Sequence, residues 1–276
     1  MAGCTNAPSA MTHDPAVRLY DAHVHLAAEA LQEERSAILQ SYAAIGLAKA
    51  VVVGTAPQDW PAVLTLCRDE PRFLPAIGLH PWEITRAPND WQHRFLQALD
   101  QGAAVIGEIG LDRSRQAPAF ELQTEAFRFQ MAVATQRNLP VSIHCVRAIG
   151  ALMEILRTVE LPTRGFHLHA YQGPIELIGE LMDRGAYFSF HSGQLRPKAK
   201  CISAVLRAVS ADRLLIETDA PAGLPTAEWR EFSLADGNLC HPGNLRSGYK
   251  AIAQLRGLSY GALREQIEAN FLRYFN

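Results

Sequence analysis

The sequence predicts a single (β/α)8 barrel, also known as a TIM barrel. Short apolar runs alternate with longer amphipathic stretches along the whole chain, which is typical of an α/β protein with a parallel sheet. Most of these runs are continuously apolar, as expected of strands buried on both faces. There are eight such runs, a number that favours a closed barrel over an open doubly wound sheet. The open sheet is the alternative, but no glycine-rich phosphate loop follows an early strand.

The expected elements follow one another without a change of composition, so we expect one domain over residues 17–276. The strands are expected at Val17–His23, Ala50–Gly54, Phe73–Gly78, Ala104–Glu108, Val141–Cys145, Gly165–His169, Ala186–Phe190 and Leu214–Thr218. The helices are expected at Glu29–Ile45, Ala62–Arg68, Trp91–Leu99, Ala119–Gln136, Gly150–Val159, Pro174–Arg184, Lys198–Val209, Asn244–Leu255 and Tyr260–Phe275.

Composition narrows the class of protein. The chain has 276 residues, of which 48% are hydrophobic and 20% are charged, as in ordinary soluble proteins. A net charge of −2 disfavours gripping duplex DNA by bulk positive charge. Five scattered cysteines without a CxxC pair favour a reducing compartment, so we expect a cytoplasmic protein. Residues 1–16 have no apolar signal-peptide core and are expected to be a disordered lead-in, and no membrane association is expected.

Histidines and carboxylates gather at one end of the expected strands. Six of the eight strands carry them at their carboxyl ends, where barrel enzymes build their active sites. Surface histidines scattered at random would not show this distribution. The residues concerned are Asp21, His23, His25, His80, Glu108, Asp112, His144, His167, His169, Glu217 and Asp219.

The first strand and the two buried acids suggest a metal site. His23 and His25 are two residues apart, so both imidazoles face the same side of a strand and can chelate a metal; two core histidines are the alternative. Glu108 and Asp219 follow apolar runs and need a cation or several donors to remain charged. For Glu108 the alternative is a salt bridge to an arginine inside the barrel. Glu217 is expected to be a structural hydrogen-bond acceptor.

The remaining candidates are individually weaker. His144 and His169 end apolar strands, and His167 shares the face of His169 and competes for its role. His80 begins a loop, where it could contact substrate or simply make a loop hydrogen bond. Arg147 could reach an anionic substrate or could be solvated, and His191 is interpreted as a lone polar loop residue.

These strand ends, in this order, resemble the TatD family of metal-dependent deoxyribonucleases, which belongs to the amidohydrolase-like barrels. The resemblance extends from Tyr20 to Phe275, and its motifs are highly specific together although each is short. The motifs are Asp21-Ala22-His23-Val24-His25-Leu26, Gly78-Leu79-His80-Pro81, Gly107-Glu108-Ile109-Gly110-Leu111-Asp112, Ile143-His144, His169-Ala170-Tyr171-Gln172-Gly173, Glu217-Thr218-Asp219-Ala220-Pro221 and Asn270-Phe271.

The resemblance implies a ligand for every position of a two-metal site. His23, His25 and Asp219 would hold one divalent ion, His144 and His169 the second, and Glu108 would bridge both. By the same resemblance His169, rather than His167, is the ligand. His80 would lie near the scissile phosphate.

The chain departs from the family pattern in three places. Arg147 stands three residues after His144 where the family often has an arginine after two, and Tyr171 replaces the usual phenylalanine. The segment Ala222–Gly243 is long. These changes leave the expected ligands in place, and Arg147, Tyr171 and His80 are the expected substrate contacts.

Two divalent cations, Zn²⁺, Mg²⁺ or Mn²⁺, held roughly 3.5–4 Å apart could clamp the attacking and leaving oxygens of a phosphodiester. The catalytic residues would be Asp219, which orients the water and takes its proton, together with Glu108 and His80. The leading hypothesis is therefore a deoxyribonuclease that degrades DNA ends or single strands. The alternatives are a metal-dependent hydrolase of C–N or ester bonds in small molecules and, third, a non-catalytic barrel serving as a partner module.

Overall fold

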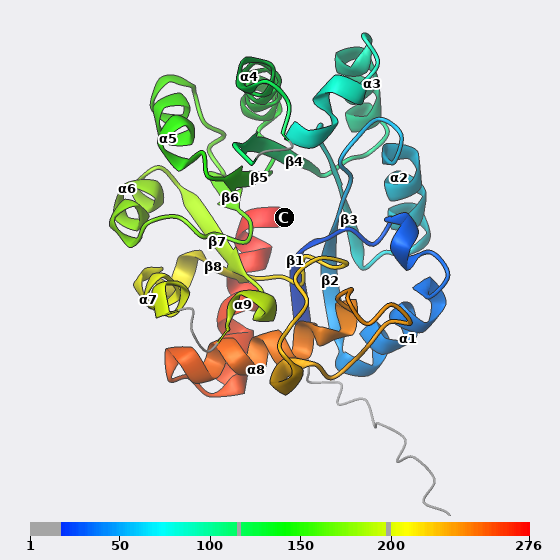
Figure 1. Cartoon of the computed structure of the whole chain (residues 1–276), viewed down its shortest axis with the longest axis vertical. Helices are drawn as coiled ribbons and strands as arrows, with labels where there is room; N and C mark the ends of the chain where they lie inside the picture. Colours follow the sequence, from blue (N-terminus) through cyan, green and yellow to red (C-terminus); the bar gives the residue numbers. More distant parts are fainter. Residues whose placement is uncertain (1–17, 115–116, 197–199) are drawn as a thin grey trace, which may run out of the picture.

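The computed structural model describes residues 18–114, 117–196 and 200–276, so the expected lead-in at residues 1–16 lies outside the described residues. The eight expected strands are all present, and they form one sheet in the order β1 to β8 with parallel pairing throughout. Helices surround this sheet in a ring (Figure 1). The predicted (β/α)8 barrel is confirmed. The strands are β1 Leu19–Val24, β2 Leu47–Val53, β3 Phe73–Ile77, β4 Val105–Asp112, β5 Val141–Val146, β6 Phe166–Leu168, β7 Ala186–Phe190 and β8 Leu214–Ile216.

The helices also follow the expected order. They are α1 Arg35–Ile45, α2 Trp60–Asp69, α3 Trp91–Asp100, α4 Phe120–Arg137, α5 Ile149–Thr158, α6 Ile178–Asp183, α7 Lys200–Ala208, α8 Leu245–Arg256 and α9 Tyr260–Phe275. Two expected helices are shorter, because their first turns are separate 3-10 helices at Glu29–Leu31 and Ile175–Leu177. The first residues of the helix expected at Lys198 lie outside the described residues. None of the helices in the described part of the chain is long and apolar enough to cross a membrane.

Strand β4 is longer than the sequence predicts, and the extension matters for the site. Its pairing with β5 continues past Gly110, so that Asp112 lies beside Val146. Gly110 has a φ of +152°, and a Cβ at this position would collide with the carbonyl of His144. Only glycine avoids this collision, which keeps β4 and β5 together as far as Asp112.

Two backbone hydrogen bonds draw the last strand against the first at the carboxyl end of the barrel. The N–H of Asp219 donates to the carbonyl of His23 over 3.0 Å, and the N–H of His25 donates to the carbonyl of Ala220 over 2.8 Å. The chain segments that carry His23, His25 and Asp219 are therefore fixed side by side by main-chain geometry alone.

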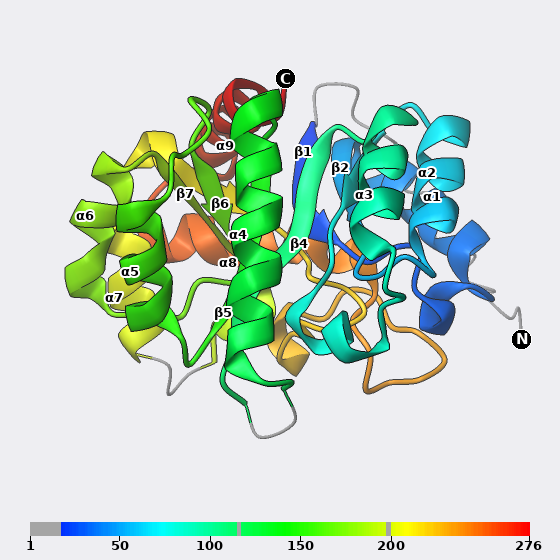
Figure 2. The ribbon, with the colours of Figure 1, turned by 90° about the horizontal axis from the view of Figure 1, so that it is seen from above.

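Helix α9 packs across the opposite end of the barrel (Figure 2). The Asn270 side chain donates to the carbonyls of Ala211 and Leu214 over 2.7 and 2.8 Å, at the start of β8. The Tyr274 hydroxyl donates to the carbonyl of Val141 over 2.6 Å and accepts from the N–H of the same residue over 2.8 Å. The segment around Asn270 thus anchors strand starts.

Replacing Tyr274 by phenylalanine tests this anchor. We expect Tyr274→Phe to lower the free energy of unfolding by roughly 2–4 kcal/mol, because a buried N–H and a buried carbonyl lose their partner. Urea denaturation at a fixed metal concentration measures the change. Tyr260→Phe is the matched control, since the Tyr260 hydroxyl on the same helix has no hydrogen-bond partner. Equal stability of the two variants would contradict the anchoring role.

Candidate metal centre

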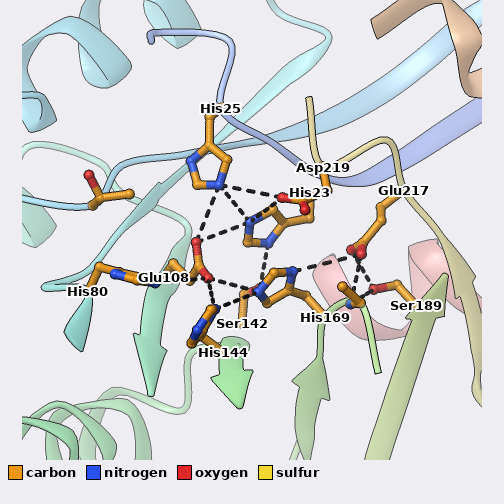
Figure 3. A network of polar contacts seen from close by, with 12 residues as sticks. His23, His25, His80, Glu108, Ser142, His144, His169, Ser189, Glu217 and Asp219 are labelled. Carbon is orange, nitrogen blue, oxygen red and sulfur yellow. Dashed lines mark hydrogen bonds and ion pairs between the residues drawn. The ribbon is translucent and has the colours of Figure 1, made fainter. Parts of the chain in front are cut away.

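The carboxylate of Glu108 stands at the centre of a group of imidazoles (Figure 3). Glu108 comes from β4 and is 2% exposed. Its Oε1 atom lies 2.8 Å from Nδ1 of His144, which belongs to β5, and 2.8 Å from Nε2 of His169, which follows β6. Nε2 of His80, which follows β3, lies 3.4 Å from the same oxygen. Three strand ends therefore meet at one carboxylate oxygen.

The second oxygen of Glu108 faces the first strand. Its Oε2 atom lies 3.4 Å from Nε2 of His23 and 3.3 Å from Nε2 of His25. The carboxylate of Asp219 adjoins the same pair, with Oδ1 at 3.7 Å from Nε2 of His25 and 4.0 Å from Nε2 of His23. The sequence-predicted ligands at β1, β4, β5, β6 and β8 are thus brought together, and Glu108 divides its two oxygens between two clusters.

The donor atoms are arranged as metal ligands usually are. Nε2 of His23 and Nε2 of His25 face one another at 3.2 Å, and Nδ1 of His144 faces Nε2 of His169 at 3.3 Å. Nitrogen lone pairs that converge in this way are stabilised by a shared cation, and imidazole with carboxylate suits Zn²⁺ or a similar divalent ion. Three groups of side chains place one ligand atom each within 4.8 Å of the others: His23 with His25 and Asp219, His23 with Glu108 and His169, and His80 with Glu108 and His144. The residues present therefore fit a metal.

Electrostatics keep Glu108 ionised despite its burial. Burial alone would raise the pKa of Glu108, but the surrounding histidines, His169 foremost, outweigh it and hold this pKa well below its ordinary value. The alternative of an arginine partner inside the barrel was wrong, because the ion-pair partners of Glu108 among the described residues are all histidines.

Glu217 lies beside His169, near the ring nitrogen that does not face Glu108. One carboxylate oxygen accepts the backbone N–H of Ala170 over 2.7 Å, and the other accepts the hydroxyl of Ser189. Ala170 has a φ of +44°, a conformation that costs energy for a residue with a Cβ, so the hydrogen bond stabilises a strained position directly after His169. Oε1 also lies 3.8 Å from Nδ1 of His169. Glu217 is the structural acceptor that the sequence predicts.

Asp112 is a supporting residue to which the sequence analysis gave no role. Its Oδ2 atom accepts from Nε2 of His144 over 3.0 Å and from the indole N–H of Trp82 over 2.8 Å. A histidine ligand commonly directs its second nitrogen to a carboxylate, which fixes the orientation of the ring. The signal was present in the Gly-Leu-Asp sequence that ends β4, but the strand was expected to stop at Glu108.

His167 and His169 both lie near Glu217 but otherwise have different neighbours. His167 is fully buried, its Nε2 is 2.6 Å from the hydroxyl of Ser189, and its Nδ1 is 3.3 Å from the hydroxyl of Ser142. Burial lowers the pKa of His167 to about 3, so this imidazole is neutral in the folded protein. His169, not His167, faces Glu108.

The other sequence candidates occupy different positions. His80 makes the expected loop hydrogen bond, since its Nδ1 accepts the N–H of Trp82 over 3.1 Å, and its Nε2 faces Glu108. Tyr171 is 3% exposed and its hydroxyl donates to the carbonyl of Pro174 over 2.9 Å. Arg147 is exposed with a φ of +53°. Neither Tyr171 nor Arg147 is among the described residues that line the cavity in front of the histidines.

That cavity opens directly onto the candidate ligands. Its volume is about 700 Å³, within the range of ordinary small-molecule sites. His25, His80, Glu108, His144, His169 and Asp219 all contribute to its lining. Donor atoms that converge at the carboxyl ends of barrel strands, in front of an open cavity, define a metal-dependent hydrolase of the barrel type.

Comparison with known proteins gives the family. The family model described as TatD related DNase matches residues 20–276, and the chain belongs to this family. Membership makes it a metal-dependent hydrolase that acts on ester bonds, so the interpretation as a non-catalytic partner module is set aside.

Curated relatives agree with the assignment. The chain is 30% identical to the uncharacterized metal-dependent hydrolase YabD of Bacillus subtilis over 206 residues, which cover 74% of this chain and 80% of that protein. It is 28% identical to a protein of Enterobacter lignolyticus named 3'-5' ssDNA/RNA exonuclease TatD, over 75% of this chain and 80% of the relative. The solved structure of the TatD homolog YJJV from Escherichia coli superimposes with a TM-score of 0.85 at 25% identity, covering 94% of this chain and 98% of that one.

Removing one imidazole of the first strand tests the ligand assignment. We expect His25→Ala to lose about half of the bound divalent metal, because one cluster loses a ligand while the other keeps its own. Metal analysis of purified protein by mass spectrometry gives the ratio per chain. His93→Ala, an exposed histidine on α3, serves as the control. Equal metal content in His25→Ala and His93→Ala would exclude a site at β1.

Neutralising Glu217 tests whether this carboxylate supports His169 as a ligand. We expect Glu217→Gln to weaken metal affinity by about 10- to 100-fold, because the neutral amide no longer orients and polarises the ligand. Competition with a fluorescent chelator measures the affinity, and Glu176→Gln, at an exposed acid of the 3-10 helix Ile175–Leu177, is the control. An unchanged affinity would show that Glu217 only stabilises the fold.

Proposed function

We propose that this chain is a two-metal phosphodiesterase that removes nucleotides from the ends of single-stranded DNA or RNA. The observation that carries the proposal is the position of Glu108, whose two oxygens face separate pairs of imidazoles at the floor of an open cavity. The relative from Enterobacter lignolyticus, named as a single-strand exonuclease, supports nucleic acid as the substrate.

The proposed ligand assignment follows the geometry. His23, His25 and Asp219 would hold one divalent ion, and His144 and His169 would hold the other, with Glu108 shared between them. Zn²⁺, Mn²⁺ and Mg²⁺ all suit this mixed nitrogen and oxygen donor set. When bound, such ions would lower the pKa of a bound water toward neutrality and would neutralise the charge that develops on phosphate oxygens.

Side chains of the protein can position the water and the phosphate and can transfer the protons. The Asp219 side chain is 16% exposed and borders the cavity, where it can hold the attacking water and accept its proton. His80 presents its Nε2 beside Glu108 and can donate to a phosphate oxygen. Asp112 holds His144 in place, so that the ring does not have to reorganise during the reaction.

A second candidate function is hydrolysis of C–N or ester bonds in small molecules. The lining of the cavity favours it, since none of the described residues that form this lining is a lysine or an arginine. An uncharged amide or ester would meet no electrostatic barrier there. The two candidates differ in the substrate that is turned over, not in the residues that hold the metal.

We further propose that residues 17–276 act as one catalytic domain, and that the protein works in the cytoplasm. Cys67, Cys145, Cys201 and Cys240 are free thiols, which favours a reducing compartment.

An oligonucleotide assay tests the proposed function. We expect the purified protein to release nucleotides from end-labelled single-stranded oligonucleotides when Mg²⁺, Mn²⁺ or Zn²⁺ is added. Asp219→Asn should lower kcat by about 100-fold or more, because the water loses its proton acceptor. Asp236→Asn, an exposed acid of the 222–243 segment, is the control. Hydrolysis of small esters or amides without nucleotide release under any metal would favour the second candidate instead.

A further inference from the structure

The cavity in front of the metal centre has an unusual charge for a nuclease. Its lining includes three carboxylates that belong to none of the candidate metal groups: Glu29, Asp59 and Glu83. Asp59 accepts hydrogen bonds from Thr55 and Ala56, and Glu83 pairs with Arg86, which is not part of the lining. None of the described residues that line the cavity is a lysine or an arginine that could neutralise these carboxylates.

Such a cavity disfavours a strand that passes through it. Each additional phosphate would be placed against these carboxylates, and repulsion between like charges excludes such ligands. The last nucleoside of a strand is different, because its only phosphodiester is the scissile one and the remainder is an uncharged sugar and base. A neutral end group is thus compatible with the lining.

Exposed arginines that follow other strands lie outside this lining. Arg113, Arg147 and Arg196 are exposed and follow β4, β5 and β7. Arg196 lines a separate hollow of about 370 Å³, next to Gln172. The segment 221–224 separates the two spaces, since Pro221 and Ala222 line the cavity whereas Gly223 and Leu224 line the hollow. The phosphates of a bound strand can therefore lie along these arginines without entering the cavity.

Trp82 supplies a surface for a base at the rim of the cavity. It lines the cavity and is 50% exposed, more than any other large apolar side chain among the described residues. Its indole N–H is fixed to Asp112, and its ring meets His80 edge to face at a centroid distance of 5.1 Å. The indole is therefore held in one orientation at its edge while much of its surface is open to solvent.

The cavity wall offers small apolar side chains together with this indole. Ala27, Ala28, Val53 and Ala62 contribute to the lining. A flat, weakly polar group between an aromatic face and an alanine-rich wall is the usual environment of a bound nucleobase.

We propose that this cavity receives the terminal nucleoside of the strand, with its base stacked on Trp82, and that the carboxylates of the lining reject ends that carry an additional phosphate. The inference rests on the proposed exonuclease function and specifies which part of the substrate enters the cavity. Trp82 determines specificity by contact with the base, and it takes no part in proton transfer.

Substitutions at Trp82 separate stacking from hydrogen bonding. Trp82→Phe keeps an aromatic face without the N–H, whereas Trp82→Gln keeps an N–H donor without the face. We expect KM for a single-stranded oligonucleotide to rise on the order of 10-fold in Trp82→Gln and to stay near the wild-type value in Trp82→Phe, with kcat little changed in both. Equal KM values in the two variants, or a loss confined to kcat, would overturn the stacking role.

Modified ends test the content of the cavity directly. We expect wild-type protein to remove a terminal nucleotide with a hydroxyl end on the order of 10-fold or more faster than one with an additional terminal phosphate. To wild type, an oligonucleotide that ends in a tetrahydrofuran residue, which has no base, should bind about 10-fold more weakly than one with a complete end. To Trp82→Gln, the two oligonucleotides should bind with equal affinity. Glu83→Gln should narrow the discrimination against the phosphate end, and Glu125→Gln on α4, outside this lining, should not.

The outcomes distinguish the two levels of the proposal. If wild type degrades no oligonucleotide, the proposed function fails. If it degrades hydroxyl, phosphate and baseless ends at equal rates, the nuclease stands and the inference about the cavity is wrong.

Discussion

The site depends on one constraint, the burial of an ionised carboxylate at the centre of the barrel mouth. An isolated charge in this position would be strongly destabilising, and Glu108 is tolerated because imidazoles surround both of its oxygens. The same requirement explains why the residues around it come from several strands. No single strand could supply donors to both oxygens, whereas the parallel strands of a barrel deliver them from several sides.

The rest of the barrel holds these donors in place. The main-chain hydrogen bonds between the ends of β1 and β8 set His23 against Asp219. Asp112 accepts a hydrogen bond from the ring of His144, and Glu217 accepts the N–H of Ala170 directly after His169. Stability is supplied at the opposite end, where α9 anchors the strand starts through Asn270 and Tyr274. Because the stabilising contacts of α9 lie at one end of the barrel, the loops at the other end can shape the cavity, including its rim at Trp82.

The fold was readable from the sequence because the strands follow a simple periodicity, whereas the full set of candidate ligands came from the resemblance of the strand-end motifs to the TatD family. Continuous apolar runs located the strands, and polar residues that end such runs located Glu108, His144 and His169. The positions that were missed depend on tertiary geometry. Asp112 lies past Gly110, where a run containing glycines and an acid does not look like a strand, and the pairing with β5 becomes visible only in three dimensions. Packing turns the Tyr171 hydroxyl to the carbonyl of Pro174, whereas Arg147 is exposed outside the cavity lining and stays a predicted phosphate contact.

The central claim is that Glu108 is shared by two metal ions, and electron paramagnetic resonance of the Mn²⁺-loaded protein tests it most directly. Two Mn²⁺ ions per chain that share a carboxylate give a spin-coupled signal, and the coupling should disappear in Glu108→Ala while the exposed-acid variant Glu265→Ala retains it. A signal from isolated Mn²⁺ in the fully loaded wild-type protein, or coupling that survives the loss of Glu108, would contradict the account.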